Sequence, residues 1–165
     1  MQEMELIGVR VELPANAPIV LLRERSGAER LLPIFIGAPE ATAIALALDG
    51  VVTPRPMTHD LIRDVFAELG VVVDKVVVTE LRDRTFFAEL HLVRDGEHHV
   101  VSSRPSDAIA IAVRTGAPIF AAEEVIDEAG YVATVEGAEG EEPEDVVEQF
   151  REFLDSVEPE DFGSD

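Results

Sequence analysis

The sequence contains no cysteine and no tryptophan, and Lys75 is its only lysine among 165 residues. Without cysteine the chain can form no disulfide, no thiolate nucleophile and no cysteine-based zinc site, so serine or threonine would have to supply any side-chain nucleophile. The chain starts without a basic stretch and an apolar run. No segment approaches the roughly 18 consecutive apolar residues that indicate a membrane span. These absences predict a cytoplasmic globular protein with no signal peptide and no membrane partner.

The charge is strongly one-sided, with 34 acidic residues against 13 basic residues and a formal net charge of −21. Such a chain repels a polyanion at long range. Nucleic acid would therefore have to be recognised by a local group of arginines or through a bound cation. A general preference for acidic, soluble surfaces explains the same excess without any binding site.

The chain divides into a β-rich body over residues 1–135, an acidic linker over 136–142 and a C-terminal amphipathic helix with an acidic tail over 143–165. Alternating apolar residues predict strands in the body, with hairpin turns at Ser26-Gly27 and Asp95-Gly96. Helical spacing of apolar residues predicts three packed helices, within 37–50, 58–70 and 104–116. The expected fold is α+β, with a mixed, largely antiparallel sheet.

Two of the expected helices resemble each other. The segment EATAIALAL (residues 40–48) matches DAIAIAVRT (residues 107–115) at four positions, and each begins with an acidic residue after a β-rich run. An internal β-α duplication would make Glu40 and Asp107 equivalent. Alanine-rich segments also match by chance, so both explanations stay open.

Polar residues gather at the expected starts of the three helices. A carboxylate in a first helical turn is stabilised by the helix dipole, so each acid alone is explained as a helix-start residue. Arginine gains nothing there, which means that Arg55 and Arg104 each need an anionic partner, either a nearby carboxylate or a phosphate. His59, beside Asp60, is suited to proton transfer near neutral pH, or else packs as a structural histidine. Thr58 is the expected N-cap of the second helix.

If the three helix starts converge, their side chains form an inventory for phosphodiester hydrolysis. The acids Glu40, Asp60 and Asp107 would act at the reacting phosphate and hold Mg²⁺ or Mn²⁺. His59 would be the catalytic acid or base that moves the proton of the attacking water. The phosphate would be bound by the remaining basic and hydroxyl side chains of these clusters, Arg55, Arg104, Ser106 and Thr58.

A second histidine cluster is expected on the sheet. If Asp95-Gly96 forms a two-residue turn, His91 faces Val100 and lies diagonal to His98 on the same face. Together with Glu89 this pair could bind a transition metal, but a solvated sheet face explains the same pattern.

Four segments resemble the motif blocks of the bifunctional nuclease domain, and they occur in the order of that family over roughly residues 4–135: LPIFIGAPEATAIALAL, RPMTHDL, TFFAEL and SSRPSDAIAIAVRTGAPIF. The resemblance implies an α+β domain with an extensive mixed sheet, a homo-oligomer that is first of all a dimer, and nuclease activity on RNA and DNA. Phe87 departs from the tyrosine that members often carry. Matching positions are Gly37, Glu40, Arg55, Pro56, Thr58, His59, Asp60, Phe86, Arg104, Pro105, Ser106 and Asp107.

The leading hypothesis is a divalent-metal-assisted nuclease of low sequence specificity that acts on RNA or DNA. The first alternative is a non-catalytic homo-oligomeric module, in which the C-terminal helix and acidic tail bind a protein partner. The second is an enzyme or binder that acts on a small phosphorylated ligand, for which a short arginine clamp suffices. A long positive track would favour a polymer, whereas an isolated positive pocket would favour the small ligand.

Overall fold

A computed structural model describes residues 1–133 of the chain. The acidic linker predicted over 136–142 lies outside the described residues. The same holds for the helix and tail predicted over 143–165 and for the protein partner expected to bind them.

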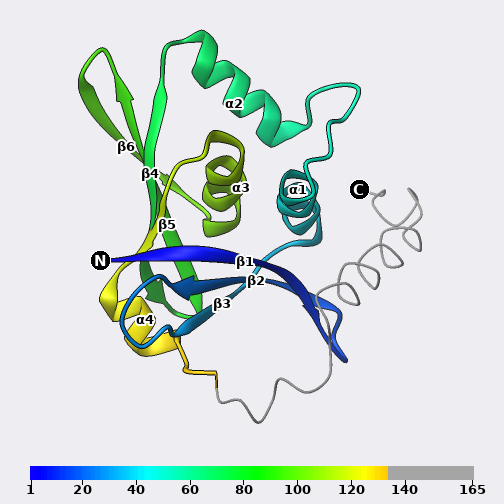
Figure 1. Cartoon of the computed structure of the whole chain (residues 1–165), viewed down its shortest axis with the longest axis vertical. Helices are drawn as coiled ribbons and strands as arrows, with labels where there is room; N and C mark the ends of the chain where they lie inside the picture. Colours follow the sequence, from blue (N-terminus) through cyan, green and yellow to red (C-terminus); the bar gives the residue numbers. More distant parts are fainter. Residues whose placement is uncertain (134–165) are drawn as a thin grey trace.

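Seven strands form one mixed sheet in the order β3-β2-β1-β7-β4-β5-β6 (Figure 1). Neighbouring strands are antiparallel except β4 and β7, which are parallel. The predicted α+β fold with a largely antiparallel sheet is therefore confirmed. The strands are β1 (Gln2–Glu12), β2 (Ala17–Glu24), β3 (Leu31–Phe35), β4 (Val72–Arg82), β5 (Thr85–Arg94), β6 (Glu97–Ser103) and β7 (Ile119–Ala121).

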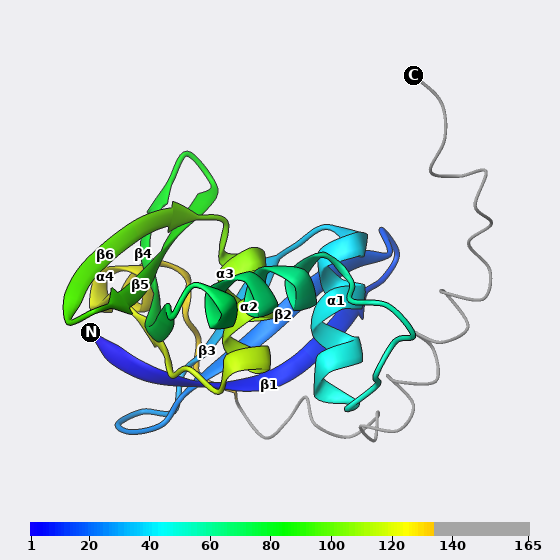
Figure 2. The ribbon, with the colours of Figure 1, turned by 90° about the horizontal axis from the view of Figure 1, so that it is seen from above.

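The three predicted helices are present, together with a fourth that the sequence pattern did not predict. They are α1 (Ala38–Leu48), α2 (Thr58–Glu68), α3 (Pro105–Thr115) and α4 (Glu123–Ala129). α1 packs on β1 and β2, α3 packs on β4 and β5, and α2 lies on α3 (Figure 2). Among the described residues, no helix has the length and hydropathy needed to cross a bilayer.

The predicted N-cap of α2 is wrong by one residue. Met57 is the N-cap, and Thr58 is already the first helical residue. The Met57 backbone N–H donates to Asp60 Oδ2 at 3.0 Å, so the carboxylate three residues into the helix satisfies a donor at its start. This bond to the Asp60 carboxylate takes the place of the threonine cap that the sequence suggests.

The two halves of the sheet repeat one plan, in which three antiparallel strands are followed by a helix. The first half is β1-β2-β3-α1 and the second is β4-β5-β6-α3, with β7 between β1 and β4. α1 and α3 are both 11 residues long, with N-caps at Gly37 and Arg104. Glu40 and Asp107 both occupy the third helical position, in agreement with the duplication suggested by the sequence.

α3 is the central helix of the core. It contacts α1, α2, β4 and β5, and every residue from Ala108 to Ala112 is buried. A helix surrounded on all sides must be apolar on all sides, which explains the unbroken apolar run in this segment. Ile44 of α1 and Ile109 of α3 are fully buried in the same core, to which α4 adds Val125 and Ile126.

Arg114, near the end of α3, joins three helices. Its side chain is only 4% exposed, and its Nε donates to Asp60 Oδ1 at 2.6 Å. The two terminal nitrogens donate to the backbone oxygens of Ala43 and Ala110 at 2.8 and 2.9 Å. The bond from Arg114 lowers the pKa of Asp60, against the raising effect of burial. A buried cation needs such full pairing, and here the pairing fixes α2 and α1 to α3.

Replacing Arg114 by methionine should lower the free energy of unfolding at pH 7 by roughly 3 kcal/mol, because Asp60 loses its buried counter-charge. The lowered pKa of Asp60 means that the pair stabilises the fold above the ordinary aspartate pKa of about 3.9. This stabilisation is lost as the pH falls through the lower folded-state value. The difference between variant and parent in urea denaturation should therefore shrink in acid.

Arg63→Met is the matched control, since Arg63 Nη1 lies 4.0 Å from Asp60 Oδ1 and its side chain is 42% exposed. An exposed pair contributes little to stability, so this variant should unfold almost as the parent does. Equal losses of stability in the two variants would show that Arg114 does not anchor α2.

Candidate functional site

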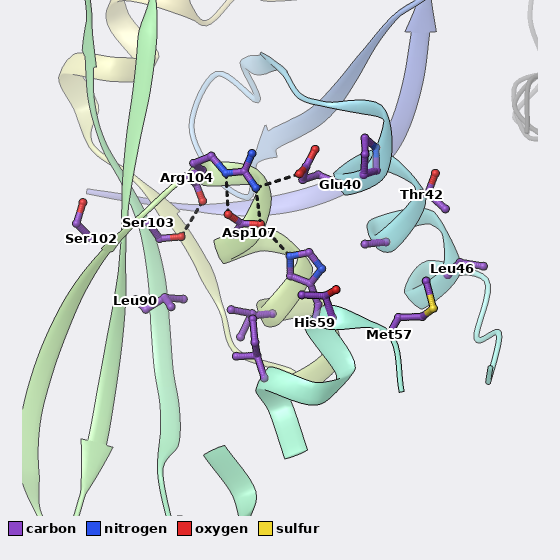
Figure 3. Close-up of a pocket in the computed structure, with 15 residues that line it drawn as sticks. Glu40, Thr42, Leu46, Met57, His59, Leu90, Ser102, Ser103, Arg104 and Asp107 are labelled. Carbon is purple, nitrogen blue, oxygen red and sulfur yellow. Dashed lines mark hydrogen bonds and ion pairs between the residues drawn. The ribbon is translucent and has the colours of Figure 1, made fainter. Parts of the chain in front are cut away.

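The starts of α1, α2 and α3 meet at one cluster of charged side chains (Figure 3). Arg104 Nε donates to Asp107 Oδ2 at 2.8 Å, and Arg104 Nη2 donates to Asp107 Oδ1 at 3.1 Å. The same Nη2 donates to Glu40 Oε1 at 3.0 Å. His59 Nε2 lies 2.9 Å from Asp107 Oδ1. The structure thus brings together four of the residues singled out in the sequence.

The local sequence explains how the two carboxylates reach this position. Arg104 is the N-cap of α3 in extended conformation, and Pro105 starts the helix, so that Asp107 comes back onto the side of Arg104 one turn later. Gly37 is the N-cap of α1, and a Cβ there would collide with Glu40 Oε2. Glycine therefore leaves the space in which the Glu40 carboxylate folds over the start of its own helix.

The protonation states follow from the contacts of Asp107. Burial acts to raise the pKa of Asp107, but the hydrogen bonds from Arg104 and His59 outweigh it and hold the pKa below its usual value. The bonds to Asp107 and Glu40 raise the pKa of Arg104. An ionised carboxylate can only accept, so His59 Nε2 must carry the hydrogen in this pair. Within residues 1–133 the second ring nitrogen, Nδ1, has no hydrogen-bond partner, and in the neutral ring it is free to accept a proton.

A cavity of about 670 Å³ opens beside this cluster. The His59 side chain is 10% exposed, whereas that of Arg104 is 64% exposed at the rim. Arg104 is the only basic residue besides His59 among the lining residues that the structure describes. The lining consists of Pro39, Glu40, Thr42, Ala43, Leu46, Met57, Thr58, His59, Ile62, Leu90, Ser102, Ser103, Arg104, Asp107 and Ile111.

Three residues of the predicted site lie elsewhere. The Asp60 carboxylate is taken up by Arg114 and by the Met57 N–H, and Asp60 does not line the cavity. Arg55 is exposed in the loop before α2 and has no ion pair within residues 1–133. Ser106 is buried at 5% exposure in the first turn of α3 and is not a lining residue. Thr58 does line the cavity.

The acids do not fit a three-ligand metal centre in this arrangement. The Arg104 guanidinium lies between Glu40 and Asp107, while Asp60 bonds to Arg114. In the described part of the chain, no group of three or more histidine, aspartate or glutamate side chains is placed to hold one ion. Two carboxylates at most would face a Mg²⁺ or Mn²⁺ ion, whose other ligands would have to come from water or phosphate.

The second histidine cluster lies on the sheet, apart from the cavity. His91 pairs with Val100 across β5 and β6, as the hairpin register predicts, and Val93 pairs with His98. His91 Nε2 lies 3.1 Å from Glu89 Oε2. No third ligand joins this pair among the described residues, so it forms a histidine–carboxylate contact outside the site.

The apolar walls of the cavity were not predicted from the sequence. Leu46 comes from α1, Met57 from the start of α2 and Leu90 from β5. In the sequence Leu46 and Leu90 read as ordinary members of apolar stripes and Met57 as a loop residue, and only the packing of α1, α2 and β5 around α3 brings the three side chains to one cavity. A weak signal existed for Met57, which stands inside the RPMTHDL block.

Known proteins resemble this chain over much of its length. The family model of the bifunctional nuclease domain matches residues 20–134. An uncharacterized protein of Mycobacterium tuberculosis is 49% identical over 165 residues, which cover 98% of each chain. Bifunctional nuclease 2 of Arabidopsis thaliana is 35% identical over 112 residues, or 65% of this chain and 34% of the plant protein. Bifunctional nuclease 2 of Oryza sativa subsp. japonica is 31% identical over 115 residues, or 68% and 35%. The chain belongs to the bifunctional nuclease domain family.

Proposed function

We propose that the protein hydrolyses phosphodiester bonds of RNA or DNA with low sequence specificity, and that the reaction takes place at the cavity between α1, α2 and α3. The observation that carries this proposal is the chain of contacts from Arg104 through Asp107 to His59 at the rim of the cavity. Membership of the family and the names of the plant relatives support it.

The proposal gives each of these side chains a distinct task. His59 Nδ1 would take the proton of the attacking water, whose oxygen bonds to phosphorus as the bond to the leaving oxygen breaks. The leaving oxygen, on the opposite side of phosphorus, takes a proton from solvent, and the imidazolium releases its own proton to water, which restores the neutral ring. Asp107 would orient the ring and stabilise its positive form, and Arg104, exposed at the rim, would bind the non-bridging phosphate oxygens.

The Mg²⁺ or Mn²⁺ ion stays a prediction from the sequence, with limited support from the side chains. Glu40 and Asp107 are the two acids that would face such an ion, and Arg104 now lies between them. When bound, a divalent ion would supply positive charge to the phosphate. The proposed proton transfers use only the side chains of this protein and water. An assay with and without EDTA shows whether cleavage also needs a divalent ion.

One observation favours a second candidate function, the binding of a small phosphorylated ligand. Arg104 is the one arginine at the cavity in the described part of the chain, and it is already shared between two carboxylates. A single guanidinium suffices for one phosphate group but makes no track along a polymer. This candidate predicts binding of a nucleotide without cleavage of any nucleic acid.

Replacing His59 by alanine should lower the rate of cleavage by about 100-fold or more, because the proton acceptor is lost. The measurement is the cleavage of labelled RNA and DNA oligonucleotides by purified protein near pH 7, with Mg²⁺, Mn²⁺ or EDTA. His91→Ala is the matched control, since His91 also contacts a carboxylate but lies outside the cavity.

Equal rates for the parent, His59→Ala and His91→Ala would show that any cleavage comes from another site or from a contaminant. A rate that drops in both variants alike would point to a general loss of structure, which thermal unfolding checks. A rate that is unchanged by EDTA would remove the divalent ion from the proposal and leave the role of His59 standing.

A homodimer in the cytoplasm completes the proposal, and the edge of the sheet supports the dimer. β6 is the edge strand of the sheet on the side of β5. Its Val100 and Val101 lie on opposite faces and are 56% and 46% exposed. At the other edge, Leu31 of β3 exchanges backbone hydrogen bonds with Tyr131. Exposed apolar edges readily pair with another strand, so a second copy is the expected partner of β6.

The double substitution of Val100 and Val101 by lysine should convert the dimer to a monomer, because charged side chains at an edge oppose strand pairing. Light scattering after gel filtration gives the mass of each form. A monomeric parent protein would remove the dimer from the proposal, and a variant that remains dimeric would move the interface away from β6.

A further inference from the structure

We propose that the cavity holds one unstacked nucleotide, so that the protein acts on single-stranded nucleic acid or free nucleotides and not on duplexes. This inference rests on the proposed function, because it names the substrate of the same site. Its basis is the composition of the walls, the free polar groups between them and the scarcity of positive charge.

The apolar part of the lining suits contact with a nucleobase. Leu46 and Met57 lie on the side of α1 and α2, and Leu90 lies on the side of β5 (Figure 3). Apolar lining side chains gain free energy when the flat apolar surface of a base covers them and removes them from water. In the described part of the chain no phenylalanine, tyrosine or tryptophan lines the cavity, so the apolar contact depends on aliphatic side chains and a thioether.

Some hydroxyl groups of the lining already donate hydrogen bonds within the protein, and others have no partner in the described residues. The hydroxyls of Thr42 and Ser103 donate to the backbone oxygens of Ala38 and Arg104, at 3.0 and 2.8 Å. The hydroxyls of Thr58 and Ser102 have no hydrogen-bond partner within residues 1–133 and are free to meet the edge of a base or a sugar. A few free polar groups between apolar walls are typical of sites for small ligands.

The charge of the site excludes tight binding of a long phosphate track. Among residues 1–133, Arg104 is the only arginine that lines the cavity, and it is shared with Glu40 and Asp107. The whole chain carries a net charge of −21. Binding of a duplex depends mainly on many contacts between cations and phosphates. Arg104 can contact only one phosphate, so most of the binding free energy would have to come from contacts with the base.

The size of the cavity agrees with this occupant. A volume of about 670 Å³ lies within the usual range for sites that bury one small ligand. A paired base would first have to leave its stack, which costs a few kcal/mol, whereas a base in a single strand or in a free nucleotide is already accessible. The cavity therefore binds duplexes more weakly than single strands, before any bond is cleaved.

The test is equilibrium binding of a short fluorescein-labelled phosphorothioate oligonucleotide, which resists cleavage, as a single strand and as a duplex. The single strand should bind about tenfold or more tightly than the duplex, because only the duplex must unstack a base. A mononucleotide should compete with the single strand if the recess recognises the nucleotide itself, and a failure to compete would limit the ligand to strands.

Leu46→Trp fills the recess and should weaken single-strand binding about tenfold, as expected when the contacts with one base are lost. Leu48→Trp is the matched control, because Leu48 is on the same helix, 46% exposed and outside the cavity. Met57→Trp repeats the test at a half-exposed position, should the Leu46 variant unfold.

Equal affinities for single strand and duplex, equal effects of the variants at 46 and 48, or no binding of any probe would each overturn the inference. Because binding is read without cleavage, the two proposals fail separately. Cleavage of duplexes and single strands at equal rates would contradict the proposal that the cavity holds one unstacked nucleotide, but it would support the nuclease activity. Nucleotide binding without cleavage would support the nucleotide in the cavity and contradict the nuclease activity.

Discussion

The arrangement of the site depends on one guanidinium group held between two carboxylates. Glu40 and Asp107 stand at the starts of two helices from different halves of the sheet, and Arg104 bonds to both. Two like charges so close together would repel each other without this cation. α3 carries a second arginine near its other end, and Arg114 ties α2 to the same helix through Asp60. The two arginines of α3 thus fix the helices on both sides of the cavity.

The repeated plan of the two halves gives two equivalent helix starts, but the site is not symmetric. Asp107 has a histidine as neighbour because α2 lies on α3, and no corresponding helix lies on α1 within residues 1–133. The N-caps also differ, since Gly37 of α1 leaves room for a carboxylate, while Arg104 of α3 supplies the positive charge. The proposed chemistry depends on this difference between the halves: Asp107 contacts the imidazole of His59, whereas Glu40 contacts only the guanidinium of Arg104.

The sequence predicts most helices and strands correctly, but it does not predict which side chains from different elements contact one another. Period-two patterns and turn signals placed the hairpins, and the register of β5 and β6 follows from the Asp95-Gly96 turn. α4 was missed because its seven residues span too few turns to show a periodic pattern. The contacts of Asp60 could not be read from the sequence, since its partner Arg114 follows 54 residues later and resembles an ordinary helix-end arginine. For Glu40, His59 and Asp107 the sequence named the residues, and only the fold shows that they meet.

The most direct test of this account is the tautomer of His59, which nitrogen NMR distinguishes in a protein with only four histidines. The account predicts that the neutral ring carries its hydrogen on Nε2, held by the ionised Asp107, and leaves Nδ1 free as the proton acceptor. A neutral ring with its hydrogen on Nδ1, in the presence of an ionised Asp107, would contradict the geometry on which the proposed chemistry is built.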